Sequence, residues 1–171
     1  MTRAVSALDV IKVITCTKYL MNSTFAGYKY DKRDNSLLKE IGFTEAESDF
    51  LIHNDVCRIA TSKDDIPHVV PVSYVFERGV FYFATDYGTK KLTNLKANGN
   101  LALTVDVYNS TNNKAVCVQG RAKIIESGPD FNRLYSVFYG KFEWVRATPW
   151  KEGEAPFVAV IPFTKVSWGL G

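Results

Sequence analysis

From residue 56 to the C-terminus, apolar residues recur in short runs that are rich in β-branched and aromatic side chains. Runs of this length and composition, bounded by polar residues and glycine, are typical of β-strands. Six strands are predicted, over residues 56–62, 68–76, 80–85, 101–108, 115–125 and 157–168. The chain therefore contains a mainly β region, in which no internal repeat is visible.

The connections between these runs favour antiparallel pairing. The connection 77–79 contains glycine and the connection 112–114 is equally short, so both are expected to close hairpins. Pro71 lies inside the second run and has no N–H to donate, which places it at a bulge or a sheet edge. Six mainly antiparallel strands in about 115 residues predict a small closed β-barrel rather than a parallel sheet, because closure removes exposed edges.

Three segments carry helical signals. Thr44 and Glu47 have the spacing of a capping box and introduce a short helix that ends near residue 54. Thr89 is the expected N-cap of a helix over 89–97, which presents two leucines on one face. Residues 129–142 place four large apolar side chains at helical spacing, and this helix is expected to cover one mouth of the barrel.

The N-terminal part of the chain has a different texture. Leu8, Ile11 and Ile14 fit one helical stripe, so a helix is predicted there, although the β-branched residues of the same stretch also suit a strand. We therefore divide the chain into an N-terminal extension, residues 1–43, and one domain, residues 44–171.

Composition limits the functional classes. The chain has 21 basic and 18 acidic residues, and a formal charge of +3 is too small to predict a nucleic-acid or membrane-surface partner. Three widely spaced cysteines argue against a disulfide framework, and two histidines complete no zinc-binding spacing. The N-terminal apolar stretch is too short for a membrane span and has no signal cleavage site. We expect a cytoplasmic protein without a metal centre.

The segment 85–100 carries the clearest chemical signal. A predicted strand ends at Thr85, a turn containing glycine follows, and Lys90 and Lys91 occupy the first turn of the predicted helix. Free N–H groups and the positive end of the helix dipole meet there, so two lysines are unfavourable unless an anion is bound. A phosphate group would resolve the conflict. The alternative is that both lysines are solvated on the helix surface.

A second basic group accompanies this segment. Arg58 interrupts an apolar strand, and if the first and third strands are neighbours, Arg58 and Lys63 converge with the helical lysines on one phosphate. The alternative is an ion pair between Arg58 and an acidic residue. His68 and Ser73 flank Pro71, where irregular backbone could offer N–H groups to a ring-shaped ligand. Cys57 and Cys117 lie in apolar strands and are expected to be buried and unreactive.

No nucleophilic triad, paired-carboxylate motif or glycine-rich nucleotide loop is present. An enzyme built on this chain would therefore take its reactivity from a cofactor. The 11 Phe, 9 Tyr and 3 Trp could stack on a flat heterocycle, although aromatic residues in a barrel more often belong to the core.

Residues 44–169 resemble the FMN-binding split β-barrel proteins related to pyridoxamine 5'-phosphate oxidase. The resemblance rests on RIATSK (58–63), PHVVPVSYVF (67–76), FYFATDYGTKKLTNLKANGN (81–100) and VQGRAKII (118–125), with the closing VSWGL. It implies a six-stranded antiparallel split barrel with flanking helices, FMN as the cofactor, and a homodimer with flavin at the subunit interface.

The resemblance also implies which residues bind the flavin. The segment like RIATSK supplies basic contacts, the strand end and the paired lysines hold the ribityl and phosphate groups, and the kinked strand lies along the isoalloxazine edge. The implied cofactor-binding residues are Arg58, Ile59, Ala60, Thr61, Lys63, Val70, Val72, Ser73, Ala84, Thr85, Thr89, Lys90 and Lys91.

The chain departs from pyridoxamine phosphate oxidases where those enzymes bind substrate. Their tyrosine-arginine-serine motif is replaced by FNRLYSVFYGKFEW on the later helix, their arginine-containing C-terminal segment is missing, and Lys114 and Ala115 stand where a glutamine is usual. We therefore expect a flavin oxidoreductase acting on another small molecule. The alternatives are a non-catalytic flavin carrier or sensor, and a split barrel that binds deazaflavin or haem. His68 is the only residue-based reason to consider haem.

Overall fold

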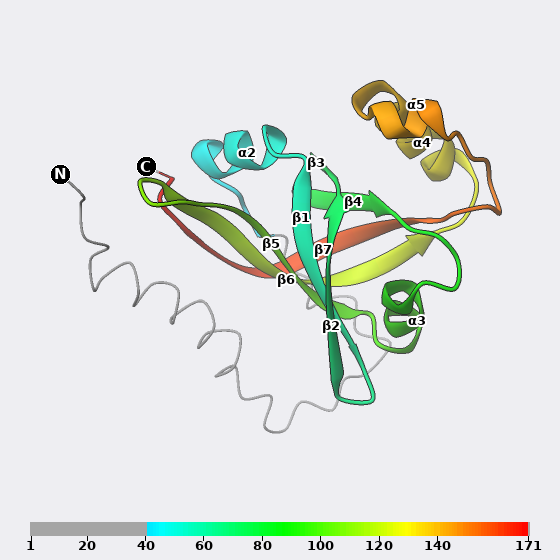
Figure 1. Cartoon of the computed structure of the whole chain (residues 1–171), viewed down its shortest axis with the longest axis horizontal. Helices are drawn as coiled ribbons and strands as arrows, with labels where there is room; N and C mark the ends of the chain where they lie inside the picture. Colours follow the sequence, from blue (N-terminus) through cyan, green and yellow to red (C-terminus); the bar gives the residue numbers. More distant parts are fainter. Residues whose placement is uncertain (1–40, 171) are drawn as a thin grey trace.

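The computed structural model describes residues 41–170, so the helix expected near the N-terminus lies outside the described residues. Within this range the chain forms one curled sheet of seven strands with four helices around it (Figure 1). The elements are α2 (Glu45–Ile52), β1 (Val56–Lys63), β2 (Ile66–Ser73), β3 (Val75–Glu77), β4 (Val80–Ala84), α3 (Lys90–Ala97), β5 (Asn100–Tyr108), β6 (Asn113–Ile125), α4 (Pro129–Lys141), α5 (Glu143–Ala147) and β7 (Phe157–Trp168).

The strands follow one another in the order β2-β1-β5-β6-β7-β4-β3, and every neighbouring pair is antiparallel. The outermost strands, β2 and β3, are not paired with each other. The sheet therefore does not close through hydrogen bonds between its end strands, contrary to the closed barrel that the strand pattern predicts. The split barrel implied by the resemblance is confirmed. Pro71 lies on the edge strand β2, where its missing N–H costs no ladder bond between two inner strands.

The structure has seven strands instead of the predicted six because the second run is divided at Tyr74. The Tyr74 side chain is fully buried, and its hydroxyl donates to the Leu51 carbonyl at 2.6 Å. The Tyr74 backbone N–H donates to the Asp55 carbonyl at 3.0 Å. Its backbone N–H therefore pairs outside the sheet, and the chain leaves β2 at one edge and begins β3 at the other.

The predicted hairpins are confirmed. Arg78 and Gly79 connect β3 to β4 with φ angles of 52° and 79°, the positive values that a two-residue turn between twisted strands requires. Asp64 and Asp65 make the same kind of turn between β1 and β2, with φ angles of 52° and 59°. The hairpin between β5 and β6 also forms, but its connection is residues 109–112 and not 112–114, because Asn113 and Lys114 already pair with β5.

Two apolar cores lie on opposite faces of the sheet. The inner core lies within the curl of the sheet, where α2 and α3 contribute Leu51, Leu92 and Leu95. The outer core packs α4 and α5 against the sheet, chiefly through Phe131, Phe138 and Phe157. Strand β7 serves both, because Val158 and Val160 belong to the inner core while Phe157 and Ala159 belong to the outer one. The helix predicted over 129–142 is therefore confirmed, but its expected place over one mouth of the barrel is wrong, because its apolar face packs on the outside of the sheet.

A buried carboxylate joins α2 to β7. The capping box is confirmed: the Thr44 hydroxyl accepts from the Glu47 N–H, and the Glu47 carboxylate accepts from the Thr44 N–H. Glu47 is only 5% exposed and also accepts from the Ser167 hydroxyl at 2.7 Å and from the Lys165 ammonium. Burial alone would raise the pKa of Glu47, but these hydrogen bonds outweigh it and hold the pKa below its ordinary value.

Along residues 41–170, no helix combines the length and the apolar character that crossing a membrane requires.

Candidate functional site

Helix α3 and the α4–α5 pair lie at the same end of the sheet (Figure 1). A cleft of about 400 Å³ opens between them. On the sheet side it is lined by the ends of β2 and β4 and by the start of α3, through Val72, Ser73, Ala84, Thr85, Asp86 and Lys91. Five of these six were predicted to bind a flavin. The structure therefore brings together predicted residues that are up to 19 positions apart in the sequence.

Strand pairing fixes the position of the C-terminal end of β4, which lines the cleft. Ala84 pairs with Phe157 at the start of β7, and the Thr85 N–H donates to the Pro156 carbonyl at 3.1 Å. The chain then leaves the sheet through Gly88, whose φ of 79° suits the sharp turn before α3. The start of α3 and the loop before β7 are thereby held on either side of Thr85.

The first turn of α3 keeps its N–H groups available to a ligand. Thr89 is the N-cap, as predicted, but its side chain does not cap the helix. Its hydroxyl donates to the Asp86 carbonyl at 2.9 Å and lies 3.0 Å from the Thr85 hydroxyl. Because the Thr89 proton is used in this way, Thr85 is the donor between the two hydroxyls. Free backbone N–H groups at a helix N-terminus are suited to an anion.

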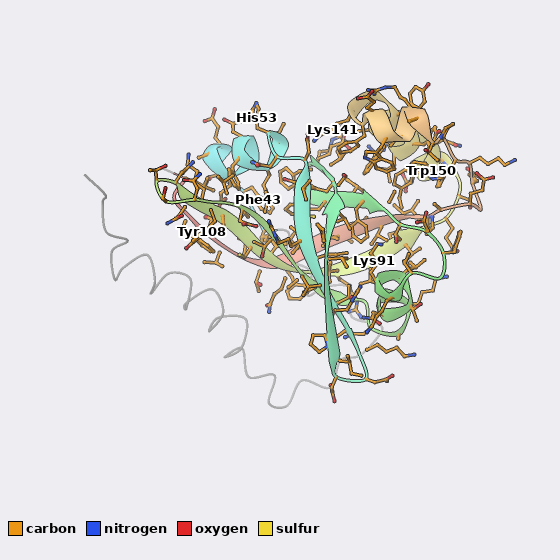
Figure 2. The ribbon with its side chains drawn as sticks, in the orientation of Figure 1. Phe43, His53, Lys91, Tyr108, Lys141 and Trp150 are labelled. Carbon is orange, nitrogen blue, oxygen red and sulfur yellow. The ribbon has the colours of Figure 1, made fainter. Side chains whose placement is uncertain are left out.

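The two lysines of this turn are not equivalent. Lys91 (Figure 2) is half-buried and lines the cleft. Lys90 is exposed and is not among the lining residues. The first turn of α3 contains no acidic residue to balance them. A phosphate group in the cleft would thus meet the Lys91 ammonium and the helix N–H groups together.

The opposite side of the cleft was not predicted from the sequence. It is formed by α5 and by the loop between α5 and β7, through Trp144, Thr148, Pro149, Trp150, Glu154 and Ala155. The Trp144 and Trp150 rings are parallel within 2°, with centroids 5.7 Å apart. Trp150 is held further by an edge contact with Tyr135 at 5.1 Å and by a hydrogen bond from its Nε1 to the Ala155 carbonyl at 3.2 Å.

The convergence of Arg58 with the lysines of α3 was expected on the premise that the first and third predicted strands, now β1 and β4, are neighbours, and this premise is wrong. Strands β1 and β4 are not neighbours, because β5, β6 and β7 lie between them in the sheet. Arg58 instead forms an ion pair with Asp106 on the adjacent strand β5, which was the alternative interpretation. Lys63 is exposed near Asp64 at the hairpin turn. Neither basic residue is among those lining the cleft.

Alternation along β1 and β2 distributes the other predicted residues between the two faces. Ile59 and Thr61 point inward and are buried, and Val70 packs against the same core, whereas Ala60 points to the outer face. The Thr61 hydroxyl accepts from the buried Asn94 side chain at 3.2 Å, which ties α3 to β1.

His68 pairs with Thr61 across the β1–β2 ladder and is not among the residues lining the cleft. In the part of the chain that the structure describes, no group of three His, Cys, Asp or Glu side chains could hold a metal ion. Cys57 is fully buried, and burial raises the pKa of its thiol far above the ordinary range, so it is unreactive.

Solved structures share this fold at low sequence identity. A FAD-binding protein from Mesorhizobium loti is 23% identical, with a TM-score of 0.60 over 73% of this chain and 94% of that one. The haem storage protein HutZ from Vibrio cholerae is 12% identical, with a TM-score of 0.65 over 72% and 92%. General Stress Protein 26 from Bacillus anthracis is 20% identical, with a TM-score of 0.58 over 72% and 92%.

The comparison with curated proteins finds no significant match. A family profile described as pyridoxamine 5'-phosphate oxidase, however, matches residues 43–161, which is well over half of the 171 residues and includes α2, α3 and the strands that form the cleft. The chain belongs to the pyridoxamine 5'-phosphate oxidase family of split β-barrels.

Proposed function

We propose that this protein binds FMN in the cleft between α3 and α5 and acts as a flavin-dependent oxidoreductase on a small molecule. The observation that carries the proposal is that five residues implied to bind flavin, from β2, the end of β4 and the first turn of α3, line one cavity. A cavity of this size and mixed polarity is ordinary for a cofactor site. The FAD-binding relative supports a flavin in general, and the family supports its phosphorylated form.

The residues present fit a planar coenzyme with a phosphorylated tail. Lys91 and the N–H groups of α3 would hold the phosphate, and Thr85 would contact the polar chain that joins it to the ring. Val72 and Ser73 offer the end of an edge strand to the ring. Bound flavin would supply hydride chemistry at its ring, while these residues bind the coenzyme and orient it.

We further propose that the protein is a homodimer. The outer face of β1 and β2 supports this, because Val56 and Val69 are 48% and 61% exposed on the same face. Ala60 lies opposite Val69 in one ladder and opposite Ala102 in the next, which leaves a row of small apolar side chains on that face. Exposed apolar surface of this kind is typical of an interface between protein chains. Light scattering on the purified protein tests the dimer directly.

The test of flavin binding is the absorption spectrum of freshly purified protein, followed by identification of any ligand released on denaturation. We expect a yellow protein that releases FMN, or a colourless protein that becomes yellow when FMN is added. A protein that takes up neither FMN nor FAD contradicts the proposal. Turnover of an electron acceptor with reduced nicotinamide as the donor then separates an enzyme from a flavin carrier.

A further inference from the structure

The two sides of the cleft differ in charge. On the sheet side Lys91 is the single base among the described residues that line the cavity, and the proposed function assigns it to the coenzyme phosphate. The α5 side contributes two tryptophans and the carboxylate of Glu154, with neither lysine nor arginine. Asp86, which also lines the cavity, adds a second carboxylate. The space left beside the coenzyme is therefore acidic and aromatic.

In the aromatic wall formed by Trp144 and Trp150, Trp150 is held in place by several contacts, whereas Trp144 remains accessible to a ligand. Trp150 is held by the Tyr135 ring, by the parallel Trp144 ring and by its hydrogen bond to the Ala155 carbonyl. Trp144 packs on Trp150 and Phe142 but remains 44% exposed. An indole that is fixed in orientation and still accessible can stack on a planar ligand at little entropic cost.

The acidic group beside this wall is also positioned. One oxygen of Glu154 accepts from the Lys151 N–H at 3.0 Å, and the Glu154 N–H donates to the Lys151 carbonyl at 3.1 Å. The resulting turn holds the carboxylate at the cleft, next to the two indoles. Tryptophan has the strongest attraction of any side-chain ring for a cation, and the carboxylate adds to it.

We propose that the second ligand of this cleft, the molecule that meets the flavin, is a planar aromatic cation held by Trp144, Trp150 and Glu154. This inference rests on the proposed function, because it assigns Lys91 to the coenzyme. A phosphorylated or carboxylated substrate would find no basic residue among those that line the α5 side of the cleft and would face two carboxylates. The proposal therefore separates this protein from enzymes that oxidise pyridoxamine phosphate.

The test compares three rings of similar shape on the flavin-loaded protein by calorimetric titration at neutral pH: N-methylquinolinium as the cation, quinoline as the neutral ring and quinaldate as the anion. We expect the cation to bind about tenfold more tightly than quinoline and quinaldate to bind most weakly. Equal affinity for the three rings, or a preference for quinaldate, would overturn the inference.

Variants locate the binding. Trp144→Leu should weaken N-methylquinolinium by about five- to tenfold, while Trp144→Phe, which keeps a ring, should recover most of the affinity. Glu154→Gln keeps an oxygen acceptor for the Lys151 N–H but removes the charge, and should weaken the cation about threefold without affecting quinoline. Glu152→Gln is the matched control, because Glu152 accepts from the Gly128 N–H and does not line the cleft.

The outcomes distinguish this inference from the proposed function. If no flavin binds, the proposed function and this inference both fail. If flavin binds but Trp144→Leu and Glu154→Gln leave the affinity for N-methylquinolinium unchanged, only the inference fails. Thermal unfolding of each variant confirms that the fold is intact, and flavin affinity should be the same in all four.

Discussion

Lys90 and Lys91 are neighbours in the sequence, but the structure predicts different roles for them. Lys91 lines the cleft and is half-buried, while Lys90 is exposed on the helix surface. Replacing each lysine separately by alanine removes the same charge from the same helical turn. The pair Lys91→Ala and Lys90→Ala therefore tests position rather than charge, with each variant serving as the control for the other.

The magnitude follows from what each ammonium group can contact. A charge-assisted hydrogen bond from Lys91 to a phosphate oxygen contributes about 1.5 to 3 kcal/mol, so Lys91→Ala should weaken FMN roughly ten- to a hundredfold. Lys90 acts through solvent, where an exposed ion pair contributes about 0.2 to 1 kcal/mol, so Lys90→Ala should weaken FMN by about fivefold at most. Alanine suits a helix, and both variants should keep the stability of the parent.

The assay is quenching of FMN fluorescence on binding, measured at low and at high salt. Added salt should reduce the small Lys90 effect first, because screening acts most strongly on exposed charges. Riboflavin, which lacks the phosphate, serves as a second ligand, and its affinity should be the same in both variants. An equal loss of FMN affinity in the two variants, or a larger loss in Lys90→Ala, would refute the assignment of the phosphate to the cleft.

Three further predictions concern the fold, each measured by chemical unfolding. Glu47→Gln should cost about 1 to 3 kcal/mol at neutral pH. Because the pKa of Glu47 is lowered in the folded state, this loss should shrink as pH falls below about 4.3, where the unfolded chain takes up the proton, and should disappear at the lower pH where folded Glu47 is protonated too. Thr61→Val removes the partner of the buried Asn94 amide and should cost a similar amount. Gly120→Ala places a Cβ 2.8 Å from Val160 Cγ1 and should cost about 1 to 3 kcal/mol, whereas Gly140→Ala, with open space around it, should not destabilise the protein.

The local features of the fold were readable from the sequence. Strand runs, the capping box at Thr44 and the helices near residues 89 and 129 depend on contacts within a few residues, and all are confirmed. The division of the second run was not predicted because Tyr74 has the composition of a strand residue. Its hydrogen bonds to Leu51 and Asp55 connect it to the end of α2, more than 15 residues away, which no local pattern reveals.

The order of strands explains why the premise for the convergence of Arg58 with the lysines of α3 was wrong. The sequence shows a charged residue between apolar ones, and both a phosphate and an acidic side chain could satisfy it. The choice depends on which strands lie beside β1; these are β2 and β5, and β5 brings Asp106 within reach of Arg58. Strand order is a long-range property, so spacing along β1 alone could not decide between the two alternatives.

The two walls of the cleft owe their shape to different interactions, which is why only one was predicted. The α3 wall follows from a contiguous segment, where the end of β4, the turn at Gly88 and the first helical turn occur in one register. The α5 wall depends on Trp144 and Trp150 stacking on each other and on Tyr135, contacts that composition cannot distinguish from ordinary core packing. Because the walls are stabilised separately, changes at Trp144 should leave coenzyme binding intact, and changes at Lys91 should leave the aromatic wall intact. Loss of FMN binding in Lys91→Ala and loss of cation binding in Trp144→Leu would then report on two halves of one site.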